Sequence, residues 1–150
     1  MDKLRDQIDW RIRVFDSLSF PTLILRPDRT IVSVNKKFLE KIGAREADVV
    51  GQTCRNFFIR YDYDPELPCS KEQCPLDKTL KDGCGHSVLR QVKGKDGEIR
   101  WEDRHLSPIL DENGRVIYVI ESVRDVTQTK TLESMYYNIS EYLEKIIQSS

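Results

Sequence analysis

Four cysteines are the residues of this 150-residue chain best suited to chemistry. They fall in one stretch of about thirty residues, at Cys54, Cys69, Cys74 and Cys84. Four thiolates can close a tetrahedral shell around zinc or hold an iron–sulfur cluster. Compact Cys-x-x-Cys pairs are absent, so two alternatives stay open: a thiol–disulfide switch, for instance between Cys69 and Cys74, and thiols that only pack. His86 could replace one thiol as a ligand.

The other polar side chains do not form a catalytic set. The chain has two histidines, His86 and His105, and neither lies in a catalytic motif. Its sequence also lacks phosphate-binding loops, dinucleotide-binding glycine signatures and kinase motifs. We therefore expect a chain that is not itself an enzyme.

Charge and hydrophobicity exclude two classes of partner. With 24 basic and 25 acidic residues and a net charge of -1, the chain offers no broad positive surface to nucleic acid. No stretch reaches the ~20 apolar residues that a membrane span needs, and the N-terminus lacks the features of a secretory signal. We expect a cytoplasmic protein, in which cysteines favour metal or redox chemistry over structural disulfides.

Apolar spacing and turn residues predict the elements of the first half. The stripe of the first helix contains Leu4, Ile8 and Ile12, at spacings of four residues. Asn35 can cap a later helix, and Gly43 can end it. The expected elements are a helix at 1–17, a hairpin with strands at 22–25 and 31–34, a helix at 36–42, helical turns at 45–59, a loop at 60–73 and a short helix at 76–80.

The second half is rich in β-strands and ends in a helix. Strands are expected at 87–92, 98–109 and 116–123, and the Asn113-Gly114 pair favours a tight hairpin between the last two. From residue 128 apolar residues step by four and three, which is typical of a coiled coil. This stripe consists of Leu132, Tyr136, Ile139, Leu143 and Ile146. Together with the first helix, it predicts a homodimer joined through the terminal helices.

These elements combine into an α+β fold. We expect a five-stranded antiparallel sheet with short helices on one face, flanked by amphipathic helices at both ends. The corresponding division is an N-terminal helix at 1–17, a sensory domain at 18–127 and a signalling helix at 128–150.

Several motifs, in this order and spacing, resemble the PAS family over residues 15–130. They are Pro21-Thr22-Leu23-Ile24-Leu25, Ile31-Val32-Ser33-Val34-Asn35-Lys36-Lys37-Phe38, Val50-Gly51, Lys95-Asp96-Gly97, Ser107-Pro108-Ile109-Leu110-Asp111-Glu112-Asn113-Gly114 and Arg124-Asp125-Val126-Thr127. The resemblance implies a sheet curled around a small cavity. It also implies that Asp125 and Thr127 join the last strand to the outgoing helix, which Thr127 can cap. The run Cys74-Pro75-Leu76 resembles a cysteine-bearing subgroup whose cysteines are candidate metal or iron–sulfur ligands.

Charged residues alternate along the expected strand at 98–109. Alternation places Glu102, Arg104 and Leu106 on one face. Alignment with the family at Pro108 turns Glu102 and Arg104 toward the cavity, where they favour a polar or anionic ligand. The alternative is an ion pair that faces a partner. The residues expected to face a ligand are Phe38, Phe58, Glu102, Arg104 and Leu106.

The resemblance also implies expectations for two pigments. The run Gly51-Gln52-Thr53-Cys54-Arg55 is similar to the light-sensing flavin branch, whose reactive cysteine follows Gly-x-Asn. Glu102 and Val123 stand where that branch needs amides for the flavin ring, so we expect no flavin. The helix at 76–80 has no histidine for haem iron, so we expect no haem.

Together these features predict a signal-input domain. The resemblance implies that it is part of a sensor histidine kinase. It would sense a small ligand, a metal or a redox state and relay it through the C-terminal helix by rearrangement of the dimer. The alternative is a metal, iron–sulfur or redox binding module built on the cysteines. We expect the helix to continue past Ser150 into a covalently linked effector, because so short a heptad repeat is marginally stable alone.

Overall fold

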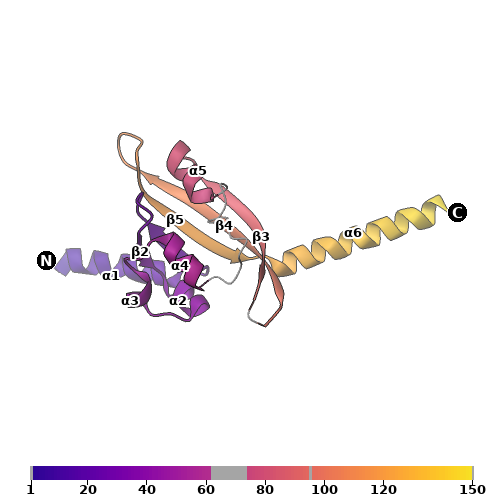
Figure 1. Ribbon diagram of the computed structural model, residues 1–150, viewed down its shortest axis with the longest axis horizontal. Coiled ribbons are helices and arrows are strands. Elements are labelled where there is room, and N and C mark those ends of the chain that lie inside the picture. The colour runs from indigo at the N-terminus through magenta and orange to yellow at the C-terminus, as the bar shows by residue number, and fades with distance from the viewer. Residues whose placement is uncertain (1, 62–73, 95, 150) are drawn as a thin grey trace.

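The protein is described here by a computed structural model that covers residues 2–61, 74–94 and 96–149. In chain order its elements are α1 (Asp2–Ser17), β1 (Thr22–Leu25), β2 (Ile31–Val34), α2 (Lys36–Ile42), α3 (Glu46–Val49), α4 (Cys54–Tyr61), α5 (Pro75–Asp82), β3 (His86–Lys93), β4 (Ile99–Leu110), β5 (Val116–Asp125) and α6 (Thr127–Gln148). Figure 1 shows α1 and α6 projecting from opposite ends of the molecule, with the sheet and the short helices between them.

The five strands form one antiparallel sheet in the order β2-β1-β5-β4-β3. This confirms the predicted α+β class and its five-stranded antiparallel sheet. The last strand, β5, lies in the middle, between β1 and β4. Because α6 follows β5 after a single residue, Val126, the outgoing helix begins at the centre of the sheet rather than at its edge.

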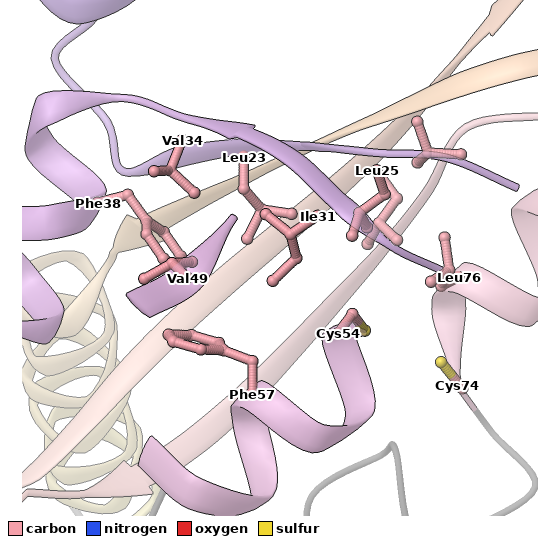
Figure 2. Packing of buried hydrophobic residues seen from close by; sticks show 12 residues of the cluster. Leu23, Leu25, Ile31, Val34, Phe38, Val49, Cys54, Phe57, Cys74 and Leu76 are labelled. Atoms are coloured by element: carbon pink, nitrogen blue, oxygen red, sulfur yellow. The ribbon is translucent and has the colours of Figure 1, made fainter. Parts of the chain in front are cut away.

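A single apolar core packs between the sheet and the short helices, as Figure 2 shows. Phe38 of α2 and Phe57 of α4 form its aromatic centre, with ring centroids 5.7 Å apart. Burial of such side chains is the main favourable term in folding. The twelve core residues are Leu23, Leu25, Ile31, Val34, Phe38, Val49, Cys54, Phe57, Cys74, Leu76, Leu106 and Val119.

Local backbone chemistry sets the ends of the short helices. Asn35 caps α2 as predicted, because its side chain accepts a hydrogen bond from the Phe38 amide. Gly43 and Gly83 follow α2 and α5 in the left-handed conformation, at φ 73° and 69°. Arg29 adopts the same region at φ 75°, in the turn between β1 and β2, where a side chain is strained.

Some predicted features fall outside the described part of the chain. The loop expected at 60–73 overlaps the end of α4, and residues 62–73, with Cys69, lie outside the described residues. The side chains of Ile8 and Phe58 also lie outside the description.

Candidate functional site

A buried cluster of charges lies on the face of the sheet that carries Glu102 and Arg104. Alternation along β4 places both side chains on one face, together with the core residue Leu106. Arg104 lies 3.5 Å from Glu102 and 3.2 Å from Glu121 of β5. Arg90 of β3 lies 3.8 Å from Glu102, and Lys41 of α2 contacts the same carboxylate. We call these five residues the charge cluster.

The register of the sheet brings the charge cluster together. Arg90 is paired directly with Glu102 across β3 and β4, and Glu121 is paired with Leu106 across β4 and β5. Lys41 reaches Glu102 from a helix, across 61 positions of sequence. The cluster therefore ties three strands and α2 to one another through ionic contacts in a dry setting, where such contacts are strong.

The cations around Glu102 keep it ionised. Burial alone would raise the pKa of this carboxyl, but Arg104, Lys41 and Arg90 outweigh burial and hold its pKa below the usual range. Three basic and two acidic side chains make up the charge cluster. Such a site suits a polar or anionic group, which could exchange contacts with the guanidinium groups.

The structure separates the predicted ligand-facing residues into two groups. Glu102 and Arg104 meet in the charge cluster, whereas Phe38 and Leu106 belong to the apolar core. The other three members of the charge cluster, Lys41, Arg90 and Glu121, were not predicted from the sequence. Alternation along the strand at 116–123 could have indicated Glu121, because it lies two residues from Val119 and Val123, which are also buried.

A hydrogen-bonded junction links the sheet to α6. The Thr127 hydroxyl oxygen accepts a bond from the Trp101 amide of β4, at 2.9 Å. The same hydroxyl donates to the Asp125 carboxylate, which also accepts from the Thr127 amide. Burial raises the pKa of Asp125, but the two bonds from Thr127 prevail, and its pKa lies below the usual range.

The junction corrects one prediction. Val126 occupies the capping position and makes no side-chain cap bond, so Thr127 is the first residue of α6 rather than its cap. Asp125 takes over the role of acceptor for the first free amide of the helix.

The cysteines are divided between the core and the surface. Cys54 and Cys74 are 5% and 7% exposed, whereas Cys84 is exposed and lies beside Asp82 and His86. In the described residues no three histidine, cysteine or acidic side chains gather around a common point that could hold a metal. This corrects the expectation of a zinc or iron–sulfur centre for the described part of the chain, which holds Cys54, Cys74 and Cys84 but not Cys69.

The terminal helices expose apolar side chains. Tyr136 is 70% exposed, and the other stripe residues of α6, namely Leu132, Ile139, Leu143 and Ile146, are exposed too. On α1, Leu4 and Ile12 are exposed. Within the described ranges no helix combines the length and apolar character needed to cross a bilayer.

Comparison with known proteins gives one family and several relatives. A sequence model of the PAS fold matches residues 15–131. A blue-light-activated histidine kinase of Rhizobium johnstonii is 28% identical over 73% of this chain and 30% of its own length. One of Brucella ovis is 32% identical over 67% of this chain and 19% of its own length. The chain thus spans less than a third of these relatives.

The solved structures agree on the fold. The PAS domain of Bordetella pertussis BvgS superposes with a TM-score of 0.67 at 19% identity, over 91% of this chain and 98% of that one. At this identity the likeness concerns the fold alone.

These relatives overturn the expectation against flavin. That expectation placed the chain outside the light-sensing branch of the family, because Glu102 and Val123 stand where that branch needs amides. Both curated relatives are activated by blue light. The expectation was therefore wrong, because two strand positions do not separate this chain from light-activated proteins.

Proposed function

This chain belongs to the PAS fold family, and from that premise we propose that it is the signal-input domain of a sensor histidine kinase. In this proposal residues 1–17 form a leading helix, 18–127 the cytoplasmic sensory domain and 128–150 the signalling helix. The chain regulates a linked effector and has no turnover of its own.

The observation that carries the proposal is the junction between the sheet and α6. Trp101 precedes Glu102 directly on β4, and its amide is bonded to the Thr127 hydroxyl. A ligand that displaces Glu102 from its cations would move this stretch of β4. Thr127 and Asp125 would pass that displacement to the first turn of α6. A small change at an input site can be amplified in this way when the output is a helix packed in a dimer.

The ligand class follows from the charge cluster. The cluster offers two guanidinium groups and one ammonium group beside the apolar core. A small molecule with a carboxylate and an apolar part matches both surfaces, because guanidinium groups bind carboxylates in a two-pronged geometry.

A kinase fusion tests the proposal. The chain is fused through α6 to the catalytic half of a histidine kinase, and autophosphorylation is measured with and without Thr127→Val. We expect the variant to change the basal rate by about fivefold or more, since coupling between sites is typically worth 1–3 kcal/mol. Thr131→Val is the matched control, because the Thr131 hydroxyl donates to the Thr127 carbonyl on the surface of α6 and not to the sheet, among the described residues. Equal rates in all three fusions would contradict signal transfer through the junction.

A homodimer through α6 is the second part of the proposal. None of the described residues of α6 is buried, so the stripe lacks cover within one chain. We expect Ile139→Asp to raise the dissociation constant of the dimer by at least about tenfold, which corresponds to ~1.4 kcal/mol, because a charge at a seam position is costly to bury.

Sedimentation velocity measures this prediction over a range of concentrations. Asn138→Asp is the control. It adds the same negative charge to α6, but position 138 lies outside the apolar stripe. The dimer proposal fails if the two variants and the unchanged chain sediment alike.

The blue-light-activated relatives favour a second candidate input, which is light. Flavin would supply the absorption, and Cys54 matches the reactive cysteine of the light-sensing branch in the resemblance. Cys54 is buried in the core at the start of α4, and Arg104 offers a donor on the sheet. Absorbance spectra of protein refolded with flavin test this candidate. Bound flavin that bleaches under blue light, but not in Cys54→Ser, would support it, and protein without bound flavin would exclude it.

A further inference from the structure

Two buried thiols lie at the starts of α4 and α5. Cys54 is the first residue of α4, and Cys74 immediately precedes α5 as its cap residue. Both belong to the same core cluster. Figure 2 shows the two sulfur atoms turned into the space between the two helix starts, on the same side of Leu76. Two thiols of one core cluster are candidates for a disulfide, which needs their Cα atoms within ~7 Å of each other.

Arg29 is a second feature of the same place. Its carbonyl oxygen accepts a hydrogen bond from the Cys54 amide at 2.8 Å, and its guanidinium pairs with Asp77 in the first turn of α5. Arg29 thus contacts the starts of both helices. Burial tends to lower the pKa of Arg29, but Asp77 raises it, and the charges of Cys74 and Cys54 act in the same direction. The guanidinium is therefore within electrostatic reach of both sulfurs.

The backbone of Arg29 supports a specific role for this residue. It is the one residue other than glycine, among those described, with a positive φ, at 75°. Strained conformations of this kind persist where the surrounding structure fixes them, and they are frequent at functional sites. The carbonyl of this strained residue bonds to the start of α4, and its guanidinium places a permanent positive charge at the start of α5, where it can stabilise an attacking thiolate.

We propose that Cys54 and Cys74 are a redox-active pair that closes to a disulfide by exchange with a small-molecule disulfide such as oxidised glutathione. One cysteine thiolate attacks a sulfur of the small disulfide, forms a mixed disulfide and releases one thiolate. The second cysteine thiolate then attacks the protein sulfur of that mixed disulfide and releases the other. The two protein thiols are oxidised, the small disulfide is reduced to two thiols, and both protons pass to solvent or to the leaving thiolates.

The disulfide would tie the starts of α4 and α5 together over the core. Because both sulfurs are buried, the first attack needs a local opening of this end of the core, and the reaction is slow relative to that of an exposed thiol. The inference rests on the placement of the thiols and is independent of the proposed signal input.

The test uses the full chain in the dark, so that photochemistry at Cys54 does not contribute. Cys69→Ser/Cys84→Ser leaves only the buried pair, and Cys69→Ser/Cys74→Ser leaves Cys54 with the exposed Cys84. Each is equilibrated with reduced and oxidised glutathione, and the disulfide is quantified by mass after alkylation. We expect the equilibrium constant for the disulfide of the buried pair to exceed that of the control pair by at least about tenfold. Equal constants, or mixed glutathione adducts alone, would overturn the proposal.

Peptide mapping of the oxidised unmodified chain decides which cysteines pair. A Cys54–Cys74 linkage supports the proposal, and a Cys69–Cys74 linkage overturns it.

Arg29→Asn tests the role of the positive charge apart from that of the backbone conformation, because asparagine tolerates positive φ. We expect oxidation of the buried pair to slow several-fold in this variant, and an unchanged rate would overturn the role of Arg29.

Discussion

Replacing Glu102 by glutamine is expected to lower the free energy of unfolding by roughly 3–5 kcal/mol, the usual loss when one partner of a buried ionic network is removed. The neutral amide leaves Arg90, Arg104 and Lys41 with the carboxylate of Glu121 as the remaining anion of the charge cluster. Positive charges near one another in a dry setting repel strongly. Urea unfolding followed by circular dichroism measures the loss.

The control for Glu102→Gln removes the same charge at an exposed position. Glu98 is 72% exposed at its side chain and lies 4.0 Å from Arg100. Glu98→Gln is expected to change the free energy of unfolding by no more than about 0.5 kcal/mol, because exposed pairs are screened by water. Similar midpoints for Glu102→Gln and Glu98→Gln would show that the charge cluster does not stabilise the fold.

The pH dependence gives this prediction a second measurement. The pKa of Glu102 in the folded chain lies below its ordinary value. As pH falls, the unfolded chain therefore binds a proton at this carboxyl at a higher pH than the folded chain does. The stability due to Glu102 is therefore fully present above the ordinary pKa of glutamic acid and is lost as pH falls through the lowered folded pKa. The difference in stability between the unchanged chain and Glu102→Gln should shrink over that acidic range and stay constant at neutral pH.

The strands and most helix ends were predictable from the sequence because each has a local cause. The turn at Asn113-Gly114 separated β4 from β5, and Gly43 ended α2 by adopting a conformation that most residues avoid. Helix α6 begins one residue before its predicted start, because Thr127 is its first residue and not its cap. The Thr127 hydroxyl instead bonds to Trp101 of another strand, a contact that no local pattern indicates.

The candidate site was predictable only in part, for the same reason. Alternation placed Glu102 and Arg104 on one face, but their partners come from other elements. Lys41 joins them from α2, and the meeting depends on how the helix packs over the sheet. For the cysteines, residues close in sequence were expected to meet in space and do not all do so. Closeness in sequence suggested one centre, whereas Cys84 is on the surface and Cys54 and Cys74 are inside.

Asn35 is a second position where a single substitution should have a large effect. The side chain is fully buried, and its oxygen accepts hydrogen bonds from the amides of Thr22 and Phe38, at 2.9 and 3.0 Å. Its amide nitrogen donates to the Phe20 carbonyl at 2.9 Å. One residue thus caps α2 and fastens the start of β1 to the end of β2.

Asn35→Ala is expected to lower the free energy of unfolding by roughly 3 kcal/mol, because it removes a helix cap and leaves two donors and one acceptor without their partner. Asn35→Asp keeps an acceptor for both amides and places a negative charge at the start of a helix, so its loss should be smaller. Asn113→Ala, in the exposed hairpin between β4 and β5, should stay within about 0.5 kcal/mol of the unchanged chain. Urea midpoints rank the three variants. If Asn35→Ala unfolds at the same midpoint as Asn113→Ala, the three side-chain bonds do not hold β1, β2 and α2 together, and the core must do so without them.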